Sequence, residues 1–278
     1  MRPYVVVDAF AREPLRGNPV AVFFDCADLT PVLMQRIAGE MNLSEVTFVL
    51  PPRAGGDARV RVFTPVNELP FAGHPLLGTA VALGPYLRRD RLLLETAMGP
   101  VSFALERRAG RVVAARMRQP VPRWRLFDRA ADLLAALGVA ASTLPVEVYR
   151  NGPRHVFVGL GGVAALSALR PDHRALAAFE DLAVNCFAGA GKHWRNRMFS
   201  PAYGVVEDAA TGSAAGPLAV HLARHGRVPY GREVRIRQGV ELGRGSLMLA
   251  RAEGSGEDVV SVEVSGEAVT VAHGRIHV

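Results

Sequence analysis

The sequence predicts an α+β protein built from two halves of similar design. Strand-like segments with alternating residue types outnumber helical ones along the 278 residues, and the few helical segments are rich in alanine. No Gly-x-Gly-x-x-Gly follows the first strand-like segment, so the dinucleotide-binding fingerprint of a parallel doubly wound sheet is absent. An internal repeat, described below, is the third observation and divides the chain into its halves.

The first half combines strands with two expected helices. Residues 30–41 have helical spacing, with Leu33, Ile37 and Met41 on one face and Thr30 as the expected N-cap. A helix of small residues is expected from about 75 to 83. The expected strands of this half are 4–7, 20–24, 46–50, 58–63, 92–95, 101–106 and 112–117.

A proline-rich segment, Gln119-Pro120-Val121-Pro122, marks the expected boundary between the halves. We therefore expect an N-terminal lobe over 1–120, a C-terminal lobe over 121–265, and a last strand over 266–278 that returns to the N-terminal lobe. Further helices are expected at 130–137, 173–178 and 214–225. The further strands are expected at 146–149, 154–160, 182–187, 197–199, 233–238, 246–252, 259–264 and 269–271.

The internal repeat is the most informative feature of the chain. Residues 61–65 read Arg-Val-Phe-Thr-Pro, and residues 197–201, 136 positions later, read Arg-Met-Phe-Ser-Pro. Each segment is followed by a loop with an acidic residue and then by a helix of small residues, at 72–83 and 211–220. Two such halves facing one another would bring both loops to a single cleft.

Gly73 and Gly212 mark the two expected helix starts in this repeat. Backbone N–H groups lack partners at a helix N-terminus, and the helix dipole is positive there. Two N-termini directed into one cavity form a site for a carboxylate or an enolate-like anion. Taken alone, each segment is better interpreted as an ordinary capped helix, with Ser213 only a cap residue in the second. Because the arrangement occurs in both halves, we favour the anion site.

The charge balance suggests polyanion binding at first sight, with a formal net charge of +7 and an isoelectric point near 10.2. Lys192 is the only lysine, however, and the arginines are scattered rather than grouped in blocks. The chain also lacks a zinc-finger cysteine pattern and the aromatic–basic interleaving of single-strand binders. We therefore expect a small anionic substrate and no nucleic acid.

Several cofactor chemistries are disfavoured by the same residues. Gly191-Lys192 is followed by His193 instead of Ser or Thr, so the chain has no P-loop. Lys192 lies in a polar stretch, which does not suit a Schiff-base lysine. Cys26 and Cys186 cannot form a disulfide framework or a four-cysteine zinc site. We expect neither a cofactor nor a metal.

Membrane insertion and export are also not expected. No apolar run approaches the ~20 residues that span a bilayer. The opening residues, 1–8, are too short and too quickly charged for a signal peptide. We expect a cytoplasmic protein without membrane association.

Motifs distributed from Asp8 to about Gly245 carry a resemblance to a known family. They are Asp8-Ala9-Phe10, Gly17-Asn18-Pro19-Val20-Ala21-Val22, Asn42-Leu43-Ser44-Glu45, Phe63-Thr64-Pro65, Gly73-His74, Gly152-Pro153-Arg154, Glu207-Asp208 with Thr211-Gly212-Ser213-Ala214, and Gln238-Gly239. Together they resemble the phenazine-biosynthesis PhzF family. The resemblance implies a fold like that of diaminopimelate epimerase. Such a fold has two pseudo-symmetric lobes, each a curled, mostly antiparallel sheet around a central helix, with the active site between them.

The resemblance also implies a reaction, the isomerisation of trans-2,3-dihydro-3-hydroxyanthranilate to an aminoketone, in a homodimeric enzyme. Glu45 matches the acid/base that takes a proton from ring carbon 3 and delivers one to ring carbon 1. His74 and Asp208 match polar residues that line the ring and help proton movement. The matching substrate-binding positions are Gly73, Gly212, Ser213 and Asn18, the last without an assigned role.

The residues themselves favour the same type of chemistry. Glu45 has apolar neighbours, Leu43, Val46 and Phe48, which favour a raised pKa and hence a group that both takes and returns a proton. Without the motif, a solvated carboxylate at a strand edge is the favoured interpretation of Glu45, because charged residues are rarely buried. Before the repeat is considered, His74 is equally well a loop histidine bonded to backbone, and Asp208 equally well a capping carboxylate.

A second hypothesis is an amino-acid racemase or epimerase on the same fold, acting on another small cyclic or amino-acid substrate. The amino-acid epimerases of this architecture use two opposed cysteines beside the glycine loops. Here those neighbourhoods hold Ala72 and Ala209-Ala210, and Cys186 lies in an apolar strand where core packing is expected. The two-thiol mechanism is therefore not favoured.

Overall fold

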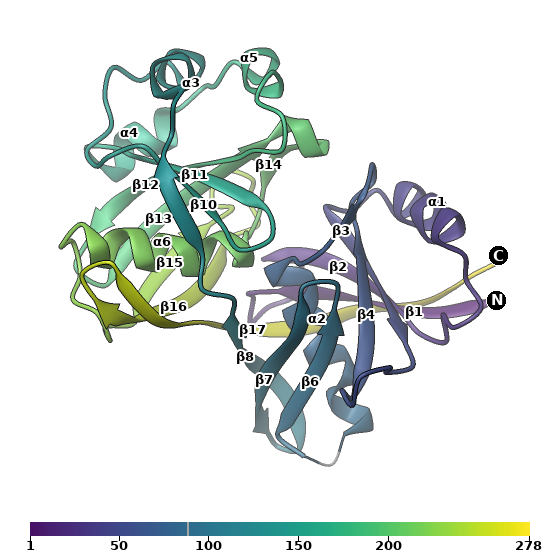
Figure 1. Ribbon diagram of the computed structural model, residues 1–278. Coiled ribbons are helices and arrows are strands. Elements are labelled where there is room, and N and C mark those ends of the chain that lie inside the picture. The colour runs from purple at the N-terminus through teal and green to yellow at the C-terminus, as the bar shows by residue number, and fades with distance from the viewer. Residues whose placement is uncertain (88) are drawn as a thin grey trace.

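The computed structural model describes residues 1–87 and 89–278 and shows two lobes of similar construction (Figure 1). We call the elements up to β8 the first lobe. Its strands are β1 (Arg2–Ala9), β2 (Asn18–Phe23), β3 (Glu45–Leu50), β4 (Ala58–Phe63), β5 (Glu68–Leu69), β6 (Arg91–Thr96), β7 (Gly99–Arg108) and β8 (Arg111–Gln119). Its helices are α1 (Pro31–Met41), α2 (Gly73–Leu83) and the short 3-10 helix Gly84–Tyr86.

The elements from β9 to β16 form the second lobe. The strands are β9 (Arg123–Leu126), β10 (Glu147–Arg150), β11 (Arg154–Gly159), β12 (Ala183–Ala190), β13 (His193–Ser200), β14 (Val205–Asp208), β15 (Val234–Gln238) and β16 (Ser246–Ser255). The helices are α3 (Ala130–Leu137), α4 (Val163–Ala168), α5 (His173–Ala177), α6 (Gly212–Arg224) and the 3-10 helix Pro201–Tyr203. The predicted α+β class is confirmed.

Each lobe curls its sheet around one buried helix, α2 in the first lobe and α6 in the second (Figure 1). Ten of the eleven residues of α2 are buried, and so are eleven of the thirteen residues of α6. A helix that is covered on every side needs small residues where the sheet approaches it closely. A methyl group at Gly78 of α2, for example, would lie 2.4 Å from Cγ1 of Val20. The alanine- and glycine-rich composition of both helices follows from this enclosure.

One long strand, β17 (Asp258–Ile276), hydrogen-bonds to strands of both lobes. It pairs antiparallel with β16, then with β8, and finally with β1, where Ala268 lies opposite Ala9 and Ile276 opposite Arg2. The sequence predicted two short strands here, at 259–264 and 269–271, and this was wrong. Gly266 interrupts the apolar pattern because the ring of Phe10 covers it, at 2.3 Å from where a methyl group would stand.

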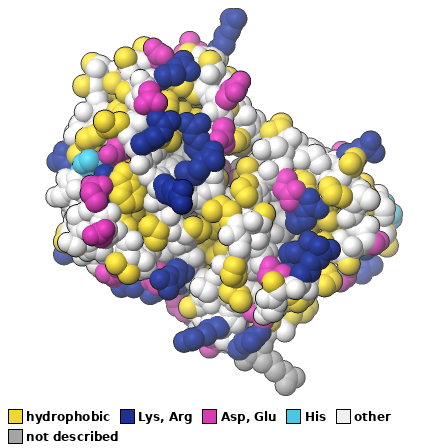
Figure 2. Space-filling view, in the orientation of Figure 1, with side chains coloured by type: hydrophobic (Ala, Val, Ile, Leu, Met, Phe, Trp, Pro, Cys, Tyr) yellow, Lys and Arg dark blue, Asp and Glu magenta, His cyan; other side chains and the backbone are white. Residues whose placement is uncertain are grey.

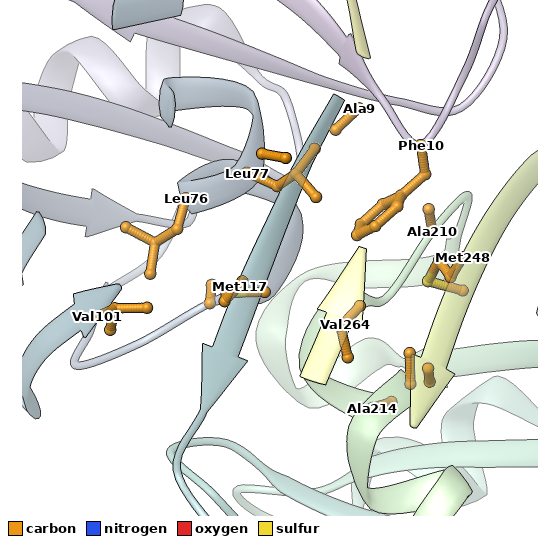
Figure 3. Packing of buried hydrophobic residues seen from close by; sticks show 14 of the residues in the cluster. Ala9, Phe10, Leu76, Leu77, Val101, Met117, Ala210, Ala214, Met248 and Val264 are labelled. Atoms are coloured by element: carbon orange, nitrogen blue, oxygen red, sulfur yellow. The ribbon is translucent and has the colours of Figure 1, made fainter. Parts of the chain in front are cut away.

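The main hydrophobic core crosses the junction between the lobes (Figure 3). Leu77 of α2 and Met117 of β8 belong to it together with Ala214 of α6 and Met248 of β16. Phe10 lies between these groups, 1% exposed, with a φ of 61°. A bulky side chain is rare in this left-handed region, so the packing of its ring sustains local backbone strain. The two lobes therefore share one packed interior at this point.

The exposed surface carries the large arginine content in separate groups. Figure 2 shows basic side chains on both lobes in groups that have acidic side chains beside them. Ion pairs join several exposed arginines of the chain to carboxylates, as Arg125 is joined to Asp128 and Arg129 to Asp132. No helix among residues 1–87 and 89–278 is long and apolar enough to cross a membrane.

Candidate active site

The N-termini of α2 and α6 meet at the lobe junction. A methyl group at Gly73 would lie 2.3 Å from the backbone carbon of Gly212 and 2.3 Å from the nitrogen of Ser213, so only glycine permits this approach. Neither helix start has a side-chain cap. The first N–H groups of both helices therefore lack intrahelical partners at one place, and the two dipoles add. An anion is the ligand that such a junction favours.

Both helices begin two residues earlier than the expected ranges 75–83 and 214–225. Gly73 and Gly212 are the first helical residues, and Ser213 lies inside the helix, so Ser213 is not a cap residue. The N-cap position of α6 is Thr211, whose hydroxyl donates to Oδ2 of Asp208 at 2.7 Å. The side chain of Ser213 is thus free from the capping role.

Glu45 and His74 face each other beside this junction. Glu45 opens β3, and its Oε2 lies 3.3 Å from Nε2 of His74, the second residue of α2. Their side chains are 15% and 3% exposed, and neither atom has a hydrogen-bond partner. Burial, with a smaller effect of the charge on Asp208, raises the pKa of Glu45 well above its usual value, and burial lowers the pKa of His74 to about 3. The pair is therefore a basic carboxylate beside a neutral imidazole, which suits reversible proton transfer.

Asp208 reaches the same place from the second lobe. It ends β14, is 3% exposed, and its Oδ1 accepts hydrogen bonds from Nδ2 of Asn18 at 2.7 Å and from Oγ of Ser44 at 3.2 Å. Burial raises its pKa to about 6, although the bonds from Thr211, Asn18 and Ser44 oppose the rise. The structure therefore brings Glu45, His74 and Asp208 together at the junction of the lobes.

Asn18, whose role could not be predicted from the sequence, connects these groups. Its Nδ2 donates to Asp208 and to the backbone oxygen of Ala210 at 3.0 Å, and it lies 3.2 Å from Nδ1 of His74. Both hydrogens of this amide are donated to Asp208 and Ala210, and an amide nitrogen cannot accept, so a proton on Nδ1 of His74 would find no acceptor there. Neutral His74 then carries its proton on Nε2, the atom that faces Glu45. Asn18 thus selects the tautomer of His74.

Two residues that the sequence analysis missed secure the start of α6. Pro217 has no N–H, so the carbonyl of Ser213, four residues earlier, loses its helical donor. Nδ2 of Asn151 donates to that carbonyl at 2.9 Å, and Nε2 of Gln119 donates to the carbonyl of Gly212 at 2.8 Å. Pro217 lies inside the expected helix 214–225, so the sequence already indicated that the Ser213 carbonyl needs a donor from outside the helix.

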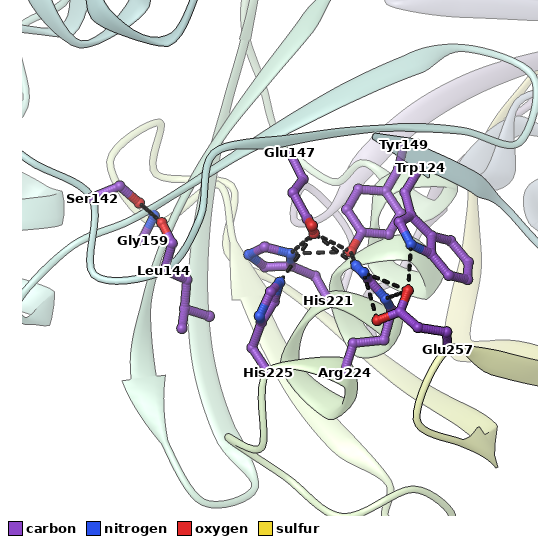
Figure 4. A network of polar contacts seen from close by, with 10 residues as sticks. All are labelled: Trp124, Ser142, Leu144, Glu147, Tyr149, Gly159, His221, Arg224, His225 and Glu257. Atoms are coloured by element: carbon purple, nitrogen blue, oxygen red, sulfur yellow. Dashed lines mark hydrogen bonds and ion pairs between the residues drawn. The ribbon is translucent and has the colours of Figure 1, made fainter. Parts of the chain in front are cut away.

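A second cluster of histidines and carboxylates lies at the other end of α6 (Figure 4). Oε2 of Glu147 is 3.1 Å from Nδ1 of His221, 3.0 Å from Nε2 of His225 and 2.7 Å from Nη1 of Arg224. The sequence analysis missed this cluster, although His221 and His225 are four residues apart, as zinc-binding histidines on a helix often are. The guanidinium of Arg224 already supplies the cation beside Glu147. We therefore interpret the cluster as a structural ion network that joins α6 to β10.

The two cysteines lie away from the helix N-termini. Cys26 is buried in the cluster around α1, and Cys186 in the cluster between β12 and the helices of the second lobe. Burial raises the pKa of both thiols to about 12. Unreactive thiols outside the site do not support the two-thiol mechanism.

The side chains of the site are closely packed in this structure. A cavity of about 770 Å³ borders the other side of Phe10 and is lined by residues such as Arg16, Leu247 and Gly266, but by none of Glu45, His74 or Asp208. We place the candidate site by its chemistry, because perturbed carboxyls beside two helix N-termini are a stronger functional sign than volume.

The chain has two lobes, each with a central helix, and the N-termini of these helices meet at paired acid/base groups. This combination is that of an isomerase of the epimerase-like fold. Residues 7–274 match the model of the PhzC-PhzF family, described as phenazine biosynthesis-like protein, and the chain belongs to this family. A curated relative from Pseudomonas aeruginosa, trans-2,3-dihydro-3-hydroxyanthranilate isomerase, is 71% identical over 277 residues, which cover 100% of both chains. The enzyme of the same name from Pseudomonas fluorescens is 67% identical over 276 residues, 99% of each chain. The chain is accordingly an isomerase.

Solved structures confirm the fold. A PhzF-family protein from Bacillus anthracis has a TM-score of 0.87 at 23% identity, covering 100% of this chain and 99% of that one. A predicted epimerase from Pseudomonas aeruginosa has a TM-score of 0.85 at 30% identity, covering 99% of each chain. A hydroxyproline epimerase from Agrobacterium vitis, at 15% identity and a TM-score of 0.69 over 98% of this chain and 91% of that one, shares the fold alone.

Proposed function

We propose that the chain converts trans-2,3-dihydro-3-hydroxyanthranilate to its aminoketone isomer in phenazine biosynthesis, without a cofactor. One observation carries the mechanism: the carboxyl of Glu45, with its raised pKa, faces the neutral imidazole of His74 at 3.3 Å, beside two helix N-termini. The 71% identity to a relative that bears the name of this activity supports the substrate.

The helix junction accounts for substrate orientation. The carboxylate of the substrate binds at the N–H groups of Gly73, Gly212 and Ser213, where the dipoles favour negative charge. This places the ring against Glu45, His74 and Asp208. Because these side chains belong to both lobes, the site is complete only when the lobes are packed together.

Proton transfer then needs only one carboxylate. Ionised Glu45 takes the proton from ring carbon 3, and the electron pair of that C–H bond moves into the diene of the ring. The same carboxyl returns a proton to carbon 1, which leaves an enol at carbon 3 that tautomerises to the ketone. The Nε2–H of His74 lies 3.3 Å from Oε2 of Glu45 and attracts its negative charge without forming a hydrogen bond, and the raised pKa of Glu45 makes it a stronger base.

The decisive variant is Glu45→Gln, which keeps the size of the side chain and removes its basicity. We expect turnover to fall by about 10²-fold to 10⁴-fold, which is the usual contribution of a general base, while the fold and substrate binding persist. Turnover is followed by the absorbance change of the dihydro substrate, with circular dichroism as the control for folding. A wild-type rate in Glu45→Gln would show that the single-carboxylate mechanism is wrong.

The racemase or epimerase hypothesis gains no support from the site, because no cysteine lies there among residues 1–87 and 89–278. The homodimer and the cytoplasmic location stay predictions, and light scattering of the purified protein tests the first of them.

A further inference from the structure

Ser213 lies at the helix junction, and the direction of its hydroxyl proton decides what it can bind. A hydroxyl that keeps its proton free donates to a carboxylate, whereas one that donates inward presents only lone pairs. Oγ of Ser213 lies 3.1 Å from Nε2 of His155, a β11 residue that is 1% exposed. The tautomer of His155 therefore sets the polarity of the Ser213 hydroxyl.

A chain of buried amides fixes that tautomer, beginning at Gln238. Its Nε2 donates to the backbone oxygen of Asp208 at 2.9 Å, and its Oε1 accepts from the backbone N–H of Thr211 at 3.3 Å. A carbonyl can only accept and an N–H can only donate, so the orientation of this amide is unambiguous. Oε1 of Gln238 also accepts from Nδ2 of Asn196 at 2.9 Å, which orients Asn196 in turn.

The chain continues from Asn196 to Asn185. Nδ2 of Asn196 donates to Oδ1 of Asn185 at 3.2 Å, and Nδ2 of Asn185 donates to the backbone oxygen of Ala183 at 3.1 Å. Both contacts require the same orientation of Asn185. Its NH₂ group therefore faces Nδ1 of His155, at 3.4 Å, and a proton on that nitrogen would meet another donor.

His155 thus carries its proton on Nε2. Burial lowers the pKa of His155 to about 3, so the ring is neutral and has one N–H only. With Nδ1 facing an amide donor, that N–H is on Nε2 and donates to Oγ of Ser213. Because Oγ of Ser213 accepts from His155, its own hydroxyl proton is free to be donated to another group.

We propose that His155 is a positioning residue, which holds the Ser213 hydroxyl as a hydrogen-bond donor to the carboxylate of the substrate. This rests on the proposed function in placing a carboxylate at the helix junction. The inference concerns residues that take no part in the proton transfer itself. It extends the site from the junction to a buried amide chain that ends at Asp208.

Nitrogen-15 NMR of the full-length protein with labelled histidine tests the tautomer without reference to activity. We expect His155 to be a neutral Nε2–H imidazole from pH 5 to pH 8, because its lowered pKa lies below that range. The assignment uses His155→Gln, which removes the signal. A Nδ1–H tautomer, or an imidazolium at these pH values, would overturn the proposal.

Binding and kinetics test the consequence. In His155→Leu we expect the KM of the dihydro substrate and the Kd of anthranilate, a carboxylate probe, to rise roughly 10-fold to 100-fold, as for loss of one bond to a charged group. The binding of aniline, which lacks the carboxylate, should not change. His155→Gln, whose amide NH₂ lies near the position of Nε2, should restore most of the affinity. Unchanged anthranilate affinity in a folded His155→Leu protein would contradict the proposal.

A double-mutant cycle separates positioning from a general structural role. If His155 acts through Ser213, then His155→Leu adds no further loss in a Ser213→Ala background. Additive losses would show that His155 acts elsewhere. If the wild-type chain binds anthranilate with this dependence but does not turn over the dihydro substrate, the proposed substrate is wrong and the positioning role stands.

Discussion

The two ends of α6 carry the same residue types with opposite electrostatics. At its N-terminal end, Asp208 lies in a site shared with Glu45 and His74, and burial raises the pKa of both carboxyls. At its C-terminal end, burial also acts on Glu147, but bonds from the two histidines, Arg224 and Tyr149 outweigh it and lower the pKa. The difference lies in the donors around each carboxylate. Glu147 accepts from His221, His225, Arg224 and Tyr149 and is an anchor, whereas Oε2 of Glu45 has no hydrogen-bond partner and can act as a base.

At the N-terminal end of α6, the electrostatic coupling between Glu45 and Asp208 can be removed by neutralising one of the two carboxyls. In Asp208→Asn we expect kcat/KM to fall about 10²-fold or more, because Asp208 accepts a hydrogen bond from Asn18 and, in the proposed function, faces the substrate ring. Since the negative charge on Asp208 raises the pKa of Glu45, the acid limb of the pH–kcat/KM profile should also move to lower pH. A profile that stays in place would show that the two carboxyls are not coupled.

At the C-terminal end of α6, where Glu147 lies, a substitution is expected to lower the stability of the fold. Glu147→Gln leaves Arg224 beside two histidines, and we expect the free energy of unfolding to fall by about 3 kcal/mol, the lower end of the cost of breaking a buried ion pair, since Arg224 keeps Glu257. Denaturant titration measures this. The kcat/KM of the folded variant should stay within about threefold of wild type, because the hydrogen bonds and ion pairs of Glu147 do not reach Glu45, His74 or Asp208.

The pH dependence of this stability has a definite sign. The pKa of Glu147 is lower in the folded than in the unfolded chain, so its contribution is complete above the ordinary value of 4.5 and is lost progressively below it. The difference in unfolding free energy between wild type and Glu147→Gln should therefore shrink as the pH falls from 5 to 3. A difference that is constant over this range would contradict the ion-network interpretation.

The residues at the N-terminal end of α6 could be predicted from the sequence far better than the cluster at its C-terminal end, for a physical reason. The repeat exposed Gly73 and Gly212 because close helix approach restricts both positions to one residue type. The polar partners follow no local rule: His155 and Asn151 flank the noticed segment 152–154, yet their contacts with Ser213 arise only when β11 packs against α6. Likewise, β17 is continuous because it pairs in turn with β16, β8 and β1, and the glycine that interrupts its apolar pattern lies under Phe10, a contact between distant residues.

The smallest effect on activity is expected for substitutions of the two cysteines. Cys186→Ala and Cys26→Ala should leave kcat/KM unchanged within about twofold, because both thiols are buried in apolar clusters and their pKa values are raised to about 12. Each variant should lose roughly 1 kcal/mol of stability through the small cavity that it creates. Iodoacetamide should likewise leave the native enzyme active. Loss of activity in Cys186→Ala, with the fold intact by circular dichroism, would instead return a thiol to the mechanism and reopen the racemase hypothesis.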